Sequence, residues 1–288
     1  MKNLITRSIT GILFVAVMIG AITASSPVPF CILFTLITAL TVWEFTGIVN
    51  AREDVEVNRL ITTVAGTYLF LAMFGDISGL MSPVGFAIYV PYLLSLVYLF
   101  ISELYLQRPN AINNWAYSML PQLYIALPFA LLNVLYFTFA KTDATVDGTL
   151  LSYSGRWLVL AVFVFLWCND TGAYCVGSLI GRHKLFPRVS PGKTWEGSVG
   201  GGVVSIAVSQ VFAHFIGLLT PVQWTAFALV VVVFGTWGDL VESLFKRQLG
   251  IKDSGKILPG HGGMLDRFDS SLMAIPAVVM FLCMLSLM

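Results

Sequence analysis

Apolar residues gather in long blocks along this chain, and polar residues occupy the shorter segments between the blocks. A helix needs about 20 predominantly apolar residues to cross the hydrocarbon core of a membrane. Because most blocks approach this length, the pattern predicts an all-α, polytopic integral membrane protein with about nine transmembrane helices. The predicted spans are residues 9–24, 28–49, 60–74, 83–101, 115–140, 157–180, 196–219, 222–240 and 272–288.

The composition supports a membrane protein, and the charge distribution predicts its orientation in the membrane. The chain has 57% hydrophobic and only 11% charged residues, which excludes an ordinary soluble globular protein. With the N-terminus in the cytoplasm, every Lys and Arg except Lys141 and Arg156 falls on a cytoplasmic segment. This distribution follows the positive-inside rule. We therefore expect a multi-pass protein with a cytoplasmic N-terminus and two long cytoplasmic loops, 181–195 and 243–270.

Two carboxylates interrupt the apolar spans. Asp170 lies inside 157–180, where an ionised carboxylate is costly unless it is paired or reaches water, so we interpret it as part of a functional site. The alternative is a neutral Asp170 that bonds a neighbouring helix. Glu44 lies beside Trp43 near the inner end of its span, and we interpret these two residues as an interfacial pair without a role in a site.

Proline and glycine positions predict local features of two spans. Pro121 and Pro128 predict that the span 115–140 is kinked or broken. Gly172, Gly177 and Gly181 give the span 157–180 a smooth face for close helix packing. Because the charged interruptions concentrate later in the chain, we expect residues 1–150 to form a scaffold with room for a lipid-facing cavity. Residues 151–288 then form the catalytic region.

The loop 181–195 is basic and contains Ser190, Lys193 and Thr194 just before an apolar helix. It does not match a phosphate-binding P-loop, because no glycine stands five residues before Gly192 and we expect no strand before it. Backbone N–H groups at the start of the next helix can still bind phosphate. The plainer interpretation is that these cations only anchor the loop at the membrane surface.

The segment 243–270 is the longest polar run of the chain, and it mixes cations, carboxylates and glycines. A nucleoside triphosphate requires Lys or Arg for its oxygens and carboxylates for Mg2+, and glycines let backbone N–H groups approach phosphate. Asp266 and Asp269 are spaced so that a helix places both on one face. The segment therefore predicts a site for a polyphosphate and its metal, although a mixed-charge loop between spans is the simpler alternative.

This segment closely resembles the signature of the phosphatidate cytidylyltransferase (CDP-diacylglycerol synthase) family. The runs Asn-Asp-Thr-Gly-Ala-Tyr before 181 and Ser-Pro-Gly-Lys-Thr-Trp-Glu-Gly after it are also similar to that family. The matching positions of the signature are Ser243, Lys246, Arg247, Lys252, Asp253, Ser254, Pro259, His261, Gly262, Gly263, Asp266, Arg267 and Asp269. The resemblance implies a nucleotidyltransferase in which phosphatidic acid attacks the α-phosphorus of CTP, giving CDP-diacylglycerol and pyrophosphate.

Positions along the chain suggest individual roles within that reaction. Asp239 ends one span and Asp266 precedes the last, so we predict both as direct Mg2+ ligands, with Asp269 as a third carboxylate and with room for a second cation. Lys246 and Arg267 are predicted to neutralise phosphate charge. The predicted substrate-binding residues are Asp170, Ser190, Lys193, Ser243, Arg247, Lys252, His261, Gly262 and Gly263.

Partners and location follow from the same reading. We expect CTP, phosphatidic acid and membrane lipid as partners and no nucleic acid, and the large apolar helix faces are compatible with a homo-oligomer. We expect the protein in the cell inner membrane with its active site facing the cytoplasm. The alternative function is a secondary transporter or channel for an anionic solute, which predicts paired repeats with polar residues at mid-membrane. The chain shows no such repeat.

Overall fold

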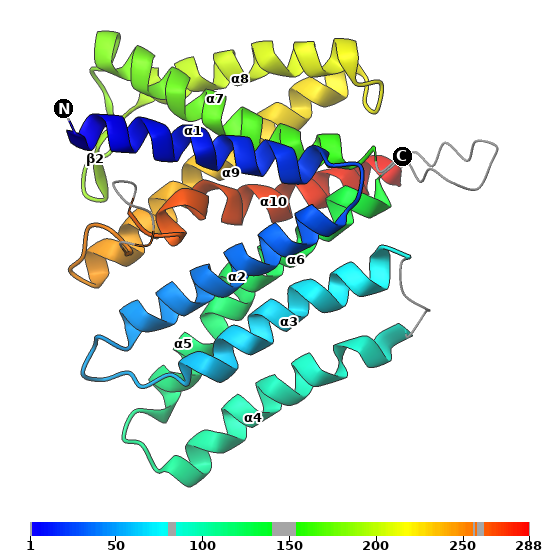
Figure 1. Ribbon diagram of the computed structural model, residues 1–288. Helices are drawn as coiled ribbons and strands as arrows, with labels where there is room; N and C mark the ends of the chain where they lie inside the picture. Colours follow the sequence, from blue (N-terminus) through cyan, green and yellow to red (C-terminus); the bar gives the residue numbers. More distant parts are fainter. Residues whose placement is uncertain (1, 80–84, 140–153, 256, 258–261, 288) are drawn as a thin grey trace. The chain divides into compact units, whose positions relative to one another are not determined.

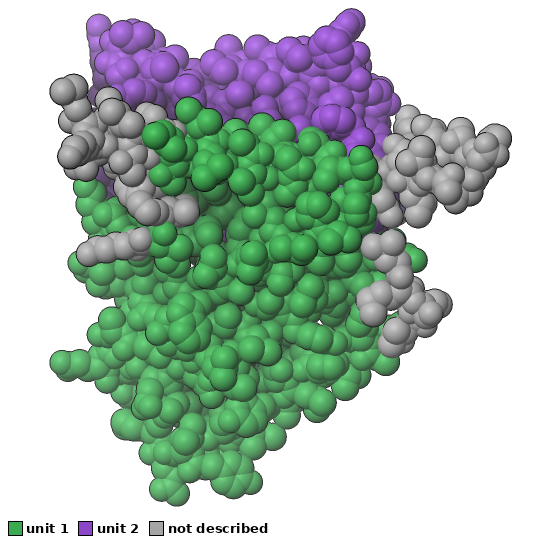
Figure 2. Space-filling view, in the orientation of Figure 1, with its two compact units in different colours: residues 1–133, 248–268 green, residues 134–247, 269–288 purple. Residues whose placement is uncertain are grey.

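The computed structural model describes residues 2–79, 85–139, 154–255, 257 and 262–287. These residues form two compact units (Figures 1 and 2). Unit 1 contains residues 1–133 and 248–268, and unit 2 contains residues 134–247 and 269–288. The division differs from the expected boundary at residue 150, because the segment before the last helix packs with the N-terminal half.

Unit 1 is built from helices that pack around α3. Helix α3 contacts α2, α4 and α6, and the chain folds back between each of these helices (Figure 1). The bounds are α1 Lys2–Thr23, α2 Val28–Val49, α3 Arg59–Ile77, the 3-10 helix η1 Gly85–Tyr89, α4 Val90–Leu106, α5 Ala111–Pro121, the π-helix η2 Gln122–Ala126 and α6 Leu127–Asn133.

Unit 2 contains three long helices, a hairpin and most of a fourth long helix. Helices α7 and α8 lie side by side (Figure 1). The bounds are the π-helix η3 Val134–Thr138, α7 Arg156–Ile180, β1 Lys184–Phe186, β2 Ser190–Thr194, α8 Trp195–Phe215, α9 Pro221–Gln248 and α10 Leu265–Ser286. Helix α10 belongs to unit 1 up to Phe268 and to unit 2 from Asp269 onward.

The prediction of a polytopic all-α membrane protein is confirmed. Among the described residues, 8 helical segments are long and apolar enough to cross a membrane, and the shorter apolar helix Ile9–Thr23 adds to them. One of these segments, Ala111–Thr138, is interrupted by η2 and η3. The π-helical stretch η2 lies between Pro121 and Pro128, and each proline removes a backbone donor from the helix ladder. The segment changes its hydrogen-bonding pattern here but stays helical throughout, so the predicted kink or break stays a prediction.

Phenylalanines fill the core of unit 1 and connect it to the start of α10. Phe34 lies 6.3 Å from Phe129 between ring centroids, and Phe129 lies 5.4 Å from Phe268 in an edge-to-face arrangement. Phe14 of α1 contacts the same Phe268 ring at 5.8 Å. Because Phe268 is fully buried in this cluster, the first turn of α10 is fixed by the N-terminal half of the chain.

The glycine face predicted for α7 packs against α8. A Cβ at Gly172 would lie 3.0 Å from the Cα of Gly201, and one at Gly177 would lie 3.5 Å from the Cα of Gly197. Gly181 lies instead against Thr194, at the end of β2. The two helix backbones therefore approach closely, as expected for small residues at a membrane helix interface.

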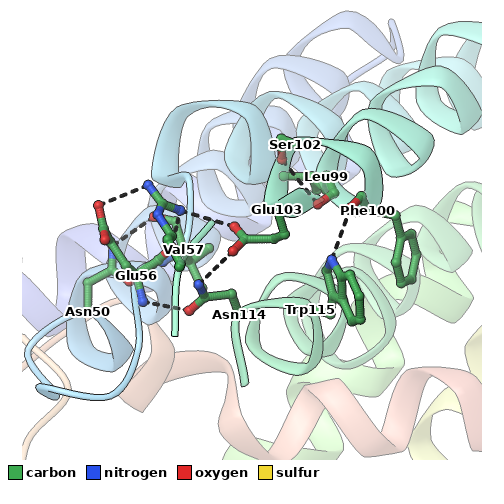
Figure 3. A network of polar contacts seen from close by, with 10 residues as sticks. Asn50, Glu56, Val57, Leu99, Phe100, Ser102, Glu103, Asn114 and Trp115 are labelled. Carbon is green, nitrogen blue, oxygen red and sulfur yellow. Dashed lines mark hydrogen bonds and ion pairs between the residues drawn. The ribbon is translucent and has the colours of Figure 1, made fainter. Parts of the chain in front are cut away.

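A polar network at the helix ends of unit 1 was not predicted (Figure 3). The Arg108 guanidinium pairs with Glu56 at 2.9 Å and with the buried carboxylate of Glu103 at 3.1 Å. Asn114 donates to Glu103 at 2.8 Å and accepts from the backbone N–H of Glu56 at 2.7 Å. The network ties the segment between α2 and α3 to the adjoining ends of α4 and α5.

Two predicted loops are shorter in the structure. Residues 184–194 form an antiparallel hairpin rather than irregular loop, so the expectation that no strand precedes Gly192 is wrong. Helix α9 continues to Gln248 and α10 already begins at Leu265, so much of 243–270 is helical. The reason is that hydropathy marks the membrane-embedded length, whereas helical hydrogen bonding continues into the polar residues at either end.

Candidate functional site

The predicted site residues fall into two groups, one in each unit. Unit 1 holds Lys252, Gly262, Gly263, Asp266 and Arg267, whereas unit 2 holds Asp170, Ser190, Lys193, Asp239, Ser243, Lys246, Arg247 and Asp269. His261 lies outside the described residues. Each group is organised around buried or half-buried carboxylates.

The group in unit 1, here called the α10 cap, consists of Glu44, Ser254, Gly263, Met264, Leu265 and Asp266. Glu44 of α2 accepts hydrogen bonds from the backbone N–H groups of Met264 at 2.8 Å and Leu265 at 3.2 Å. It also accepts from the hydroxyl of Ser254. The first N–H groups of a helix have no partner within the helix, so Glu44 caps α10 from a distant part of the chain.

The interpretation of Glu44 as an interfacial residue is therefore wrong. Its side chain is only 7% exposed, and it turns toward the segment between α9 and α10. Trp43, in contrast, is exposed and stacks on the Arg59 guanidinium at 4.0 Å. The two neighbours point in different directions because successive residues of a helix are about 100° apart around its axis.

Asp266 completes the cap from within α10. Its carboxylate accepts from the backbone N–H of Gly263 at 2.8 Å and from that of Ser254 at 3.0 Å. Asp266 therefore links both ends of the segment between α9 and α10. Its predicted role as a metal ligand stays a prediction.

The glycines of the cap are required by these carboxylates. Gly262 has a φ of 84°, a conformation that favours glycine, and a Cβ there would lie 2.6 Å from Oδ2 of Asp266. At Gly263 a Cβ would overlap Oε1 of Glu44 and the hydroxyl of Ser254. These contacts give the two glycines a packing role that does not depend on the predicted approach to phosphate.

The group in unit 2, here called the carboxylate–lysine cluster, consists of Asp170, Lys193, Asp239, Glu242, Lys246 and Asp269. The ammonium group of Lys193, on β2, forms an ion pair with Oδ2 of Asp239, near the end of α9. Ser243 donates to the other oxygen of Asp239 at 3.2 Å. The pair brings together the two polar stretches that the sequence places about 45 residues apart.

A second ion pair lies on the same helix. The carboxylate of Glu242 is fully buried, and its Oε2 forms an ion pair with the ammonium group of Lys246 at 2.6 Å. Asp269 of α10 is half-buried and lies within electrostatic range of the carboxylates of Asp239, Glu242 and Asp170. Four carboxylates thus share this region with two ammonium groups.

The remaining predicted residues of both units are positioned as follows. Ser190 is half-buried on β2, and Arg247 is exposed near the end of α9. In unit 1, Lys252 and Arg267 are exposed. The hairpin itself is fixed by Glu196 of α8, which accepts from the backbone N–H groups of Arg182 and His183 at 3.2 Å and pairs with Nδ1 of His183 at 2.6 Å.

The carboxylate–lysine cluster fits a divalent cation by its donor chemistry. In the part of the chain that the structure describes, no three His, Cys, Asp or Glu side chains converge as a ready-made metal site. The cluster nevertheless has two more carboxylates than ammonium groups, and hard divalent cations prefer oxygen ligands. The carboxylate oxygens of the cluster are the donors that would hold such an ion.

Two residues of these groups are absent from the predicted site. Glu242 shows a signal in the sequence, because its helical spacing to Asp239 and Lys246 places all three on one face, but that spacing assigns it no role. Glu44 is a carboxylate within an apolar span, and such a residue normally has a functional or structural partner. Nothing in the sequence names the partner, because it lies more than 200 residues away.

Comparison with known proteins gives a consistent result. The sequence model described as the cytidylyltransferase family matches residues 5–285. A protein of Haemophilus influenzae named phosphatidate cytidylyltransferase is 30% identical over 291 residues, covering 94% of this chain and 95% of that protein. A protein of the same name from Staphylococcus haemolyticus is 38% identical over 186 residues, covering 58% of this chain and 71% of its own. Another protein of this name, from Staphylococcus epidermidis, is 51% identical over 120 residues, covering 41% of this chain and 46% of that protein.

Proposed function

Because this chain belongs to the cytidylyltransferase family, we propose that it transfers the cytidylyl group of CTP to phosphatidic acid. The products are CDP-diacylglycerol and pyrophosphate. The observation that carries the proposal is the carboxylate–lysine cluster, in which Lys193 and Lys246 face Asp239 and Glu242 at the end of a membrane helix. The choice of phosphatidic acid is supported by the names of the similar proteins.

The reaction needs charge neutralisation more than proton transfer. An anionic oxygen of the lipid phosphate forms a bond to the α-phosphorus of CTP, and the bond from that phosphorus to the bridging oxygen of pyrophosphate breaks. The attacking oxygen is already deprotonated, so no strong general base is required. Positioning and electrostatic stabilisation are then the main sources of rate acceleration.

Lys193 and Lys246 suit this task because their present partners are carboxylates. Each ammonium group has three donors on a flexible stem and can turn from a carboxylate toward a phosphate oxygen. Ser243 keeps the Asp239 carboxylate oriented while that exchange occurs. Arg247 is a further candidate for a phosphate contact, since it belongs to the same unit and its side chain is exposed.

In this proposal Asp239 and Asp269 hold Mg2+, with Glu242 and Asp170 adding negative charge around them. When bound, the ion would neutralise phosphate charge as it develops during transfer. A second cation is compatible with the remaining negative charge of the cluster.

We further propose that the protein lies in the cell inner membrane with the N-terminus and the active site on the cytoplasmic side. The support is the distribution of Lys and Arg, of which only Lys141 and Arg156 fall on the opposite side. CTP is a cytoplasmic nucleotide, whereas the lipid phosphate lies at the membrane surface. A site at cytoplasmic helix ends would be open to both.

The test is transfer of label from α-labelled CTP into chloroform-soluble lipid by the purified full-length protein. Label should appear only with phosphatidic acid and Mg2+, and it should disappear on chelation and return when Mg2+ is added back. Diacylglycerol, which lacks the phosphate, is the matched control substrate. If the folded protein remains inert across lipids and divalent metals, the proposal fails, and solute uptake into vesicles then tests the transporter alternative.

A further inference from the structure

An apolar groove lies in unit 2 beside the carboxylate–lysine cluster. It has a volume of about 440 Å³, which falls in the range of about 300–1,000 Å³ typical of small-molecule sites. Its walls come from α8 and α9, and β1 closes one end through Leu185 and Phe186. The lining is apolar or aromatic apart from the hydroxyl groups of Ser198 and Thr236.

The groove begins at the polar end of unit 2 and runs away from it. Thr236 and Leu240 line the groove on α9 and flank Asp239, whose partner Lys193 is on the hairpin. From Leu240 the lining continues along α9 to Leu229, a distance of roughly 16 Å at about 1.5 Å per residue. This length is close to one leaflet of the hydrocarbon core, about 15 Å.

Two cations lie at the hairpin end of the groove. Trp195 and Val199 line the groove and also an open cleft whose walls include Arg182 and Lys184, together with Glu196, which pairs with His183. Together with Lys193, these two cations place positive charge at one end of an apolar channel and leave the other end without charge. An anionic phosphate joined to an acyl chain has the same distribution of charge and apolar surface.

The far part of the groove is open sideways. Val203 on α8 is 61% exposed, and Leu229 and Val233 on α9 are 45% and 42% exposed. There is room above Gly202 in the floor, since a Cβ there would make only an ordinary contact with Val232, at 3.6 Å. A chain could therefore enter from the membrane without passing through the polar end.

We propose that this groove holds one acyl chain of the lipid substrate while its phosphate lies at the hairpin end, near Lys193. The proposal rests on the function proposed above and names the place of the lipid in that site. The bilayer is as apolar as the groove, so the groove adds little affinity by hydrophobic transfer. Its contribution is positional, because a held chain limits how far the phosphate can move from the reacting α-phosphorus.

The test compares two chain lengths and a matched pair of variants. Val203→Trp fills the groove, whereas Val211→Trp makes the same change on an exposed residue of α8 outside it. With dipalmitoyl phosphatidic acid, Val203→Trp should lower kcat/KM at least about tenfold, since small misplacements of a reacting group cost this much or more. With dihexanoyl phosphatidic acid, whose chains end before Val203, activity should stay within about twofold of the wild type, as should KM for CTP.

A second readout does not require turnover. Phosphatidic acid carrying a photoreactive diazirine near the end of one chain should label peptides from α8 and α9 in the wild type and in Val211→Trp. Labelling of these peptides should fall in Val203→Trp. If the wild-type protein makes no CDP-diacylglycerol but is labelled in the groove, the proposed reaction fails while the lipid site stands.

Three outcomes would overturn the inference. One is an equal fall in kcat/KM with both chain lengths in Val203→Trp. Another is an unchanged kcat/KM with both. The third is labelling elsewhere together with a change of oligomeric mass in Val203→Trp, which would identify the groove as an interface between copies of this chain. Gly202→Leu provides an independent test, because it fills the floor of the groove rather than its exposed rim.

Discussion

The α10 cap and the carboxylate–lysine cluster use carboxylates in different ways. In the cap, Glu44 and Asp266 accept from backbone N–H groups whose positions are set by the fold. In the cluster, Asp239 and Glu242 face lysine ammonium groups on flexible stems. A backbone partner cannot leave without unfolding the segment, whereas an ammonium group can turn to a phosphate. The comparison shows that similar carboxylates bind fixed backbone N–H groups in one unit and movable side-chain ammonium groups in the other.

The largest effect on turnover should come from Asp239→Asn. The change keeps the size of the side chain and a potential acceptor for Ser243, but it removes the charge that faces Lys193. We expect kcat to fall at least about 100-fold, as when one electrostatic contact to a transition state is removed, with little change in Tm. Label transfer and thermal unfolding in detergent measure the two effects.

Asp76→Asn is the matched control for this prediction. Asp76, on α3 of unit 1, accepts a hydrogen bond from the Tyr89 hydroxyl at 2.8 Å and belongs to neither group. Its substitution should leave kcat unchanged. Turnover near the wild-type level in Asp239→Asn would show that the cluster is structural and would remove the distinction between the two units.

Glu44→Gln should produce the largest loss of stability. The buried carboxylate accepts three hydrogen bonds, and an amide would turn an N–H group toward at least one of the donors. We expect the free energy of unfolding to fall by about 2–3 kcal/mol, since a buried donor loses its charged acceptor. Thermal unfolding and limited proteolysis between α9 and α10 would detect this change.

The control for Glu44 is Glu103→Gln in the network of Figure 3, which also removes a buried charge from unit 1. Both variants should be less stable, but only Glu44→Gln should expose the segment between α9 and α10 to protease. Equal cleavage of that segment in the two variants would contradict a specific role for Glu44 in the cap.

Gly263→Ala should lower the free energy of unfolding by a smaller but still measurable amount. The added methyl group would overlap the Glu44 carboxylate and the Ser254 hydroxyl, so the cap must shift to accept it. A cost of about 1–3 kcal/mol is typical of such overpacking. Gly192→Ala is the matched control, because no atom lies within 4 Å of a Cβ at that position. Equal unfolding temperatures for the two variants would mean that the cap is not tightly packed.

The smallest effect is expected at Asp54, outside both groups. Arg52 donates to this exposed carboxylate at 2.7 Å and lowers its pKa from the ordinary value. A lowered pKa in the folded state adds stability above the unfolded pKa, and this contribution is lost as acid protonates the carboxyl. Because the pair is exposed, the difference in Tm between wild type and Asp54→Asn at neutral pH should lie within the measurement error, and it should vanish at acidic pH. A clear Tm difference at neutral pH would contradict the expectation that this exposed ion pair adds little stability.

The sequence by itself determined the class of the fold and much of the chemistry. A membrane requires spans of fixed length with satisfied backbone hydrogen bonds, so the apolar blocks predict helices with little ambiguity. Pro121 and Pro128 indicated an irregular stretch in one span for an equally local reason, and η2 lies between them. The polar signature could also be recognised from the sequence, because its residue types and spacing lie within one short segment.

Only the tertiary structure decided which carboxylates meet which partners. Glu44 reaches the start of α10 across more than 200 residues, and Lys193 reaches Asp239 from a separate polar stretch. Such contacts depend on how helices pack, and packing between apolar helices leaves no periodic signal that names a partner. The hydropathy pattern also ended this span before the helix ends, because α9 continues to Gln248 through polar residues. Local patterns therefore fixed the elements, and long-range packing assigned the roles of their polar residues.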